Sequence, residues 1–123
     1  ASRYPLYRGG SPEGTAAEVF PEATAVLLAG RLRERDESKR AFRGAVLRSH
    51  GVDPDLLPTV DQIDAALGAL TGIRALEGDF GAVGRAAEGT ILLPLNELPA
   101  ERLIRRGSPI ASGTRLTGVI GVA

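Results

Sequence analysis

The sequence predicts a mixed α/β domain in which helices outnumber strands. Two short apolar stretches, residues 15–20 and 90–95, indicate buried strands. Three longer segments repeat apolar residues with the spacing of three and four that is typical of a helix. The length of 123 residues corresponds to one domain, and an apolar share of 43% is too high for wholesale disorder.

The composition excludes several classes of protein. A net charge of zero argues against a chain that wraps nucleic acid over its whole surface. The absence of cysteine excludes disulfides, thiolate metal sites and a cysteine nucleophile. No apolar run approaches the roughly 20 residues of a transmembrane helix, and the first residues lack the apolar core of a signal peptide. We therefore expect a cytoplasmic protein with no membrane partner.

The positions of Gly and Pro predict the first elements of the chain. Residues 1–14 are rich in Gly and Pro and should form a linker or loop. The strand at 15–20 must stop at Pro21, which suits the first position of a helix because its missing N–H is not needed there. This helix should extend to about Gly30 and carry an apolar stripe of Ala23, Val26 and Leu27.

The second helix should begin after Ser38, a good N-cap, and end near Ser49 before Gly51. His50 at its end is interpreted as a partner of the helix dipole. The face predicted to be buried consists of Ala41, Ala45, Val46 and Ser49.

The third helix is the most regular pattern in the chain. Two prolines make residues 52–58 a connector, and Thr59 can then cap a helix over residues 60–76. Its apolar stripe comprises Val60, Ile63, Leu67 and Leu70.

The remaining chain is less regular. Residues 77–89 are Gly-rich and are predicted to be a loop, and the strand at 90–95 follows them. Residues 97–106 have the pattern of a short amphipathic helix, and residues 107–123 that of a flexible tail or a weak strand. Two strands do not make a stable sheet. Either the fold is mostly helical with a small sheet, or part of the sheet comes from elsewhere.

Two carboxylates stand one turn apart on the third helix, at Asp61 and Asp64. Clustered carboxylates attract a divalent cation, and oxygen ligands of this kind suit Mg²⁺ or Mn²⁺. A second interpretation is that acids near a helix start simply match the helix dipole. In the metal interpretation, like-charge repulsion predicts that Asp64→Asn leaves the stability of the metal-free protein unchanged or improved.

Glu18 is an acid inside an apolar strand, where burial without a partner is costly. It could lie at the carboxyl end of that strand, the rim where open α/β sheets bind ligands. The alternative is the solvated face of an edge strand.

Basic residues outnumber acids between Arg31 and Arg48. A positive helix pair beside a carboxylate site would suit a phosphate-bearing substrate, with Lys39, Arg40 and Arg43 as candidate contacts. The alternative is an ordinary solvated helix face.

Three segments occur in a familiar order: AEVFPEATAVLLAG (17–30), TVDQIDAALGALTG (59–72) and EGTILLPL (88–95). Together with Lys39 they resemble the second half of a family of predicted nucleases with the RNase H fold, a domain of unknown function. The D-x-x-D-A pattern that begins at Asp61 is also similar to the last acidic motif of the RuvC Holliday-junction resolvases. The resemblance covers about residues 15–95.

The resemblance implies a partial RNase H-like α/β domain over residues 15–106, preceded in the family by three further strands that are absent here. It implies hydrolysis of a phosphodiester in nucleic acid, with Mg²⁺ or Mn²⁺ held by the catalytic carboxylates Glu18, Asp61 and Asp64. Because the family's first catalytic Asp is missing, we expect weak metal binding and no activity from this chain alone.

An alternative function of a different class is a non-catalytic α/β interaction module. In that case the acids lie at the surface or match the helix dipole. In either case a strand at 15–20 without its neighbours should invite pairing with another chain. The expected partner is a second copy, or the N-terminal half that the resemblance implies.

Overall fold

The computed structural model of the chain describes residues 3–85 and 89–95, and these form a mixed α/β structure, as predicted. The described residues contain three α-helices, one short 3₁₀ helix and a three-stranded sheet. In order they are β1 (Glu18–Val19), α1 (Pro21–Ala29), α2 (Lys39–Ser49), a short 3₁₀ helix η1 (Pro54–Leu56), α3 (Val60–Leu76), β2 (Gly81–Arg85) and β3 (Gly89–Leu93).

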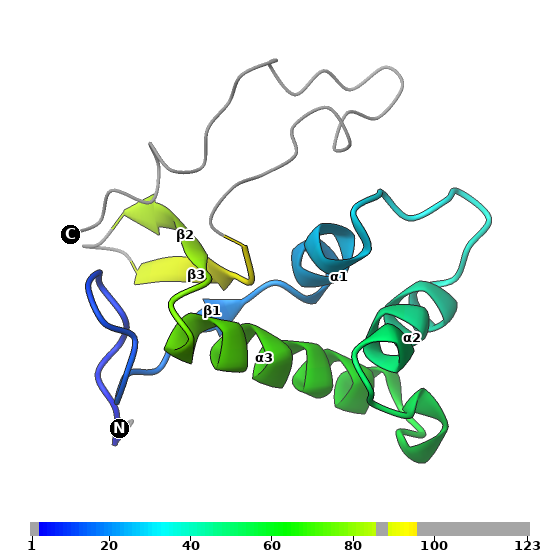
Figure 1. Ribbon diagram of the computed structural model, residues 1–123, viewed down its shortest axis with the longest axis horizontal. Coiled ribbons are helices and arrows are strands. Elements are labelled where there is room, and N and C mark those ends of the chain that lie inside the picture. Colours follow the sequence, from blue (N-terminus) through cyan, green and yellow to red (C-terminus); the bar gives the residue numbers. More distant parts are fainter. Residues whose placement is uncertain (1–2, 86–88, 96–123) are drawn as a thin grey trace.

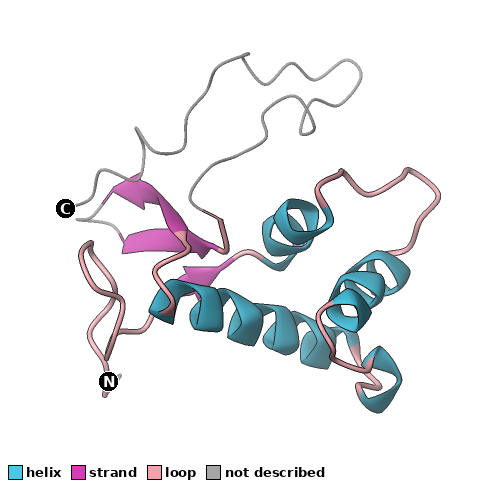
Figure 2. Cartoon of the chain, in the orientation of Figure 1, coloured by secondary structure: helices cyan, strands magenta, loops and turns pink. Residues whose placement is uncertain are grey.

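Helix α3 is the longest element and organises the others. The sheet lies beside its C-terminal half, and α2 packs near its N-terminal half (Figure 1). Helix α1 contacts both α2 and α3. Helices α1 and α2 therefore lie at one end of the molecule and the strands at the other, with α3 extending between them (Figure 2).

The sheet has the strand order β1-β3-β2. Strand β1 runs parallel to β3, with Glu18 opposite Ile91, and β2 runs antiparallel to β3. The strand predicted at 90–95 is confirmed in β3, but the loop prediction for 77–89 is wrong because β2 lies within it. The sequence of β2, GAVGR, has no clear alternation, and its strand geometry depends on pairing with β3.

Strand β1 is shorter than the predicted strand at 15–20. Ala16 pairs instead with the N-terminal segment, where the Tyr7 N–H donates to the Ala16 carbonyl at 2.7 Å and the Ala16 N–H donates to the Pro5 carbonyl at 2.8 Å. The Tyr7 ring is buried and meets Phe80 edge-on, with 5.9 Å between the ring centres. This segment therefore packs against the domain.

The three helices begin where their caps predict. Pro21 occupies the first turn of α1, and the Ser38 side chain accepts from the Ala41 N–H at the start of α2. Thr59 and Gln62 form a reciprocal capping box at the start of α3. Gly30 ends α1 with a φ of 72°, a conformation that favours glycine.

The buried face of α2 differs from the predicted one. Val46 is buried as predicted, but Ala41, Ala45 and Ser49 are exposed. The other buried residues of the helix are Phe42, Arg43, Gly44 and Leu47. Phe42 and Leu47 remove more apolar area from water than alanine can, which decides the rotation of the helix. In α3 the predicted Ile63 and Leu67 are buried, but Val60 is 38% exposed.

Two cores result from this packing. The larger joins the three helices and contains Ala25, Val26, Phe42, Val46, Leu47, Ile63 and Leu67. The smaller lies between the sheet, the end of α3 and the N-terminal segment, and contains Tyr7, Ala75, Ala82 and Leu92. A buried hydrogen bond of 3.1 Å between the hydroxyls of Thr24 and Thr71 ties α1 to α3.

The loop between α1 and α2 is closed by a bidentate ion pair. Arg31 donates from Nη1 and Nη2 to the two carboxylate oxygens of Glu37, at 2.9 and 3.0 Å. The Arg31 guanidinium lies over the Phe42 ring, 4.8 Å from its centre. The hydrogen bonds from Arg31, with a further one from the Glu34 N–H, lower the pKa of Glu37 from 4.5 to about 2.

This lowered pKa makes a pH-dependent contribution to stability. Because the carboxylate is favoured in the folded chain, the contribution is present above pH 4.5 and is lost as the pH falls toward 2. We expect the stability difference between the wild type and Glu37→Gln to shrink over that range in urea unfolding. Asp36→Asn is the matched control, because Asp36 is an exposed acid of the same loop whose side chain makes no hydrogen bond or ion pair with other described residues. An unchanged difference between pH 5 and 2 contradicts this account.

The helix predicted at 97–106 and the tail at 107–123 lie outside the described residues. Among the described residues, no helix is long and apolar enough to cross a membrane.

Candidate functional site

The two acids predicted on α3 lie in different environments. Asp61 is exposed in the first turn of the helix, as expected of a residue that matches the helix dipole. Asp64 is partly buried, with 27% of its side chain exposed, and its Oδ1 accepts a hydrogen bond of 2.7 Å from Arg43 Nη1. Asp64 is therefore already paired with a cation of the same chain.

Arg43 lies between two carboxylates. Its side chain is only 9% exposed, and its Nη2 and Nε also donate to Oε1 of Glu22, at 3.1 and 3.3 Å. Glu22 stands in the first turn of α1 and Asp64 in α3, so a residue of α2 connects acids from the other two helices. The arrangement satisfies a guanidinium that would be costly to bury alone.

A second arginine completes this cluster. Arg33 Nε donates to the other oxygen of Glu22 at 3.2 Å, and Arg33 Nη1 donates to the Glu37 carbonyl at 2.9 Å. Two cations thus face the carboxylates of Glu22 and Asp64, and their formal charges cancel. We call Glu22, Arg33, Arg43 and Asp64 the carboxylate–arginine cluster.

Glu18 does not join this cluster. The side chain of its neighbour Val19 points at α3, where a Cβ added to Gly68 would lie 3.2 Å from Val19 Cγ2. Successive side chains of a strand point to opposite faces, so Glu18 is directed away from the helix that carries Asp61 and Asp64. Its side chain is exposed.

The residues in the cluster fit a divalent cation in donor chemistry but not in arrangement. Glu22 and Asp64 offer carboxylate oxygens that converge on one cation, as Mg²⁺ or Mn²⁺ would require. That cation is the Arg43 guanidinium. Within residues 3–85 and 89–95, no group of three or more His, Cys, Asp or Glu side chains is arranged to hold a metal ion.

The three residues expected to contact a substrate phosphate differ in exposure and in their partners. The Lys39 side chain is exposed and makes no hydrogen bond or ion pair with other described residues. Arg40 is exposed but donates to the carbonyls of Leu57 and Pro58, at 2.9 and 3.3 Å. Arg43 is buried between carboxylates, so this structure does not offer it to a substrate as the charge pattern suggested.

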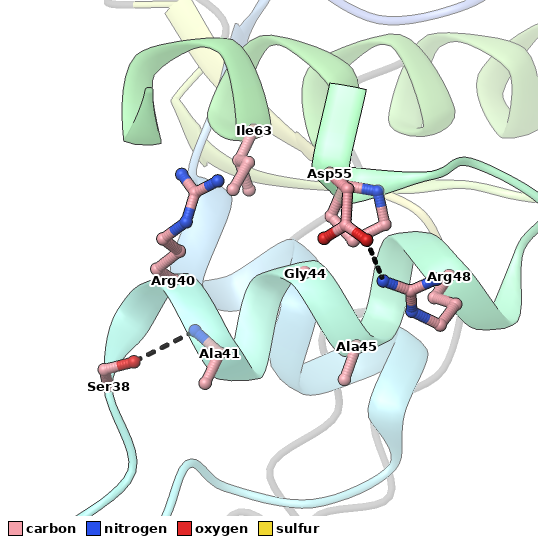
Figure 3. A pocket seen from close by; sticks show the side chains of 9 residues that line it. Ser38, Arg40, Ala41, Gly44, Ala45, Arg48, Asp55 and Ile63 are labelled. Atoms are coloured by element: carbon pink, nitrogen blue, oxygen red, sulfur yellow. Dashed lines mark hydrogen bonds and ion pairs between the residues drawn. The ribbon is translucent and has the colours of Figure 1, made fainter. Parts of the chain in front are cut away.

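A cavity of about 410 Å³ opens between α2, η1 and the start of α3. Arg40 and Arg48 stand at its two ends, and Gly44 with two alanines forms the surface between them (Figure 3). Arg48 pairs loosely with Asp55, at 3.4 Å, whereas the partners of Arg40 are neutral carbonyls. The positive charge at the Arg40 end is therefore not cancelled by an acid within the described contacts.

An apolar groove of about 420 Å³ lies on the opposite half of α3. Gly68, Gly72 and Ile73 form its helical wall, and Val19 and Leu92 contribute from the sheet. Ile73 and Leu76 at its edge are 52% and 68% exposed. The groove is chemically unlike the carboxylate–arginine cluster.

Sequence reasoning identified Asp64 as a site residue but missed Glu22 as its neighbour in space. Glu22 was visible only as an acid in the first turn of a helix, which the dipole explains. A signal did exist in the predicted α2 pattern, because rotating its buried face onto Phe42 and Leu47 also turns Arg43 inward. A basic residue on an apolar face needs an acid from a neighbouring element.

Comparison of the chain with protein-family models, with curated proteins and with solved structures finds no match. The class that the described residues define is a mixed α/β domain with a charged cluster between its three helices.

Proposed function

We propose that the chain is the C-terminal half of an RNase H-like, metal-dependent nuclease, which contributes carboxylates to a phosphodiester-hydrolysing site. The observation that carries the proposal is the convergence of Glu22 and Asp64 from α1 and α3, which follow and flank the short strand β1. The order of the three segments that resemble the nuclease family supports it. Catalysis then needs acids beyond this cluster, because hydrolysis assisted by two metals uses more ligands than two carboxylates supply.

In this proposal the acids of α3 have different roles. Asp64 is held in place by α3 and by Arg43, and Asp61 lies one turn earlier with its carboxylate open to solvent. Glu22 supplies the acid from the region of β1, because the Glu18 side chain is directed to the other face of the sheet. The bound metal would activate water and stabilise the leaving oxygen.

Nucleic acid would approach along the first turn of α2. Lys39 is exposed there, and Arg40 stands beside it at one end of the 410 Å³ cavity. Exposed cations of this kind neutralise backbone phosphates without reading sequence, so binding should weaken as salt is raised.

Metal-dependent stabilisation tests the proposal. Millimolar Mn²⁺ should raise the melting temperature of the wild-type chain, because a ligand that prefers the folded state stabilises it. At a concentration tenfold above Kd the gain is about 1.4 kcal/mol, or several degrees for a domain of this size. The measurement is a thermal melt followed by circular dichroism, in Mn²⁺ against KCl of equal ionic strength.

The variants make this test specific. Asp64→Asn should abolish the Mn²⁺ shift, and Asp61→Asn should reduce it. Asp36→Asn is the matched control, because Asp36 is an exposed acid outside the cluster whose side chain makes no hydrogen bond or ion pair with other described residues. A shift that is absent in the wild type, or that is equal in all three variants, rejects a metal site at these acids.

A second candidate function is the non-catalytic interaction module. The pairing of Asp64 with Arg43 favours it, because a carboxylate neutralised inside the protein has an evident structural role. The apolar groove with its exposed Ile73 and Leu76 also favours it. This candidate predicts no specific effect of Mn²⁺ on melting.

A further inference from the structure

Arg40 carries a charge that no acid neutralises among its described contacts. Its Nη2 donates to the Leu57 carbonyl at 2.9 Å and its Nη1 to the Pro58 carbonyl at 3.3 Å. These two bonds hold the guanidinium in place but leave most of its five N–H groups unused. A planar guanidinium that is already ordered suits an anion such as phosphate, because two parallel N–H groups can bind it.

The cavity of about 410 Å³ beside Arg40 has the size of a small-molecule site, since such sites usually measure about 300–1,000 Å³. Figure 3 shows Arg40 and Arg48 at its two ends. They lie eight residues apart on α2, which is about 12 Å along the helix axis. The surface between them is small or apolar and consists of Ala41, Gly44, Ala45, Pro54 and Ile63.

The two ends of the cavity differ in charge. Arg48 pairs with Asp53 at 3.7 Å and with Asp55 at 3.4 Å, so that end offers both donors and acceptors without an excess of positive charge. At the other end, Lys39 precedes Arg40 in the chain and also lacks an ion pair with a described residue. Two uncompensated cations match the charge of a phosphate monoester, about −1.5 to −2 at neutral pH, better than that of one carboxylate.

We propose that this cavity binds a nucleotide through its phosphate monoester, either as a free nucleoside monophosphate or as the phosphorylated end of a nucleic-acid strand. The phosphate lies on Arg40, the sugar and base lie on the apolar surface, and the polar edge of the base faces the pair of Arg48 and Asp55. No residue of the carboxylate–arginine cluster lines this cavity. Binding here needs no metal and is therefore independent of the proposed metal site.

The test is isothermal titration calorimetry on the full chain in EDTA, with dAMP, deoxyadenosine and inorganic phosphate as probes. We expect dAMP to bind at least about tenfold more tightly than deoxyadenosine, the usual effect of losing hydrogen bonds to a charged group. It should also bind more tightly than inorganic phosphate, which makes no apolar contact. No binding of dAMP, or equal binding of dAMP and either of the other probes, overturns the proposal.

Charge variants locate the phosphate. Arg40→Gln should weaken dAMP binding about tenfold, whereas Lys39→Gln should have a smaller effect that vanishes at high salt, because a more distant charge is screened. Arg35→Gln is the matched control, since Arg35 is an exposed arginine that does not line the cavity and makes no hydrogen bond or ion pair with other described residues. Equal losses for Arg40→Gln and Arg35→Gln indicate general attraction of an anion and refute the site.

A second variant separates binding from folding, because Arg40→Gln also removes two contacts to the segment before α3. Ala45→Leu fills the middle of the cavity from an exposed position and leaves Arg40 in place. It should weaken dAMP binding about tenfold, with no change in the melting temperature or in the affinity for inorganic phosphate. An unchanged affinity for dAMP excludes this cavity as the nucleotide site.

The source of the phosphate is distinguished with a strand of four deoxyadenosines, with and without a terminal phosphate. If the phosphorylated strand binds as tightly as dAMP and the other strand does not, the proposal holds and the occupant is a strand end. If dAMP binds and neither strand does, it holds with a free nucleotide as the occupant. If both strands bind equally and more tightly than dAMP, the surface follows backbone phosphates and the cavity proposal is refuted, while the proposed nuclease function is unaffected.

Discussion

Replacement of Phe42 by alanine is expected to lower the free energy of unfolding by about 3–5 kcal/mol, the largest effect of any single truncation in the described core. The Phe42 ring is 1% exposed and belongs to the cluster of apolar residues from all three helices. Its removal leaves a cavity that these helices can only partly close. The loss is a large fraction of the roughly 5–15 kcal/mol that stabilises a typical domain.

Urea unfolding of Phe42→Ala and Phe42→Leu measures this effect. Leucine keeps most of the apolar volume, so we expect its cost to stay near about 1.5 kcal/mol. Because Arg31 lies over the Phe42 ring, both variants should also loosen the loop closed by Arg31 and Glu37. Equal and small losses in the two variants contradict the central position of Phe42.

Replacement of Arg43 by methionine should cost about 2–4 kcal/mol in the absence of metal, because it leaves the partly buried Asp64 carboxylate without its cation and Glu22 with Arg33 alone. Asp64→Asn should cost about 1–2 kcal/mol, since it replaces a charge-assisted hydrogen bond with a weaker one. The spacing of Asp61 and Asp64 predicted that Asp64→Asn leaves the stability unchanged or improved. The contact with Arg43 reverses that expectation.

A double-mutant cycle checks that the two residues act together. The combined variant should lose about 1–2 kcal/mol less than the sum of the single variants, because each change removes the same contact. Arg48→Met is the matched control, since Arg48 pairs at the surface with Asp53 and Asp55 and should cost less than about 1 kcal/mol. Additive losses for Arg43 and Asp64 exclude a direct interaction.

The predicted elements agree with the structure wherever the signal is local. Ser38 and Thr59 cap the helices that they were expected to cap, and Pro21 and Gly30 delimit α1. Caps and breakers depend on the backbone within a few residues, so they can be recognised without knowing the fold. Strand β2 was not predicted, because a Gly-rich strand shows no periodicity and is defined by its partner β3.

The candidate site was less predictable, because its contacts join residues that are distant in the sequence. The sequence singled out Asp64 from its spacing to Asp61, and the basic segment that contains Arg43 from its charge. It did not indicate that the two residues meet at 2.7 Å, or that Glu22 and not Glu18 shares the arginine. Those contacts join residues about 20 positions apart on three different helices.

The sequence by itself determined the mixed α/β class, the starts of the helices and the kinds of charged group available to a site. Only the tertiary structure decided which charges meet, because the rotation of α2 about its axis is chosen by the burial of Phe42 and Leu47. That rotation carries Arg43 inward between α1 and α3. Periodicity alone cannot fix the buried face of α2 to within one residue. That one residue decides whether Arg43 is open to a substrate or neutralises the protein's own carboxylates.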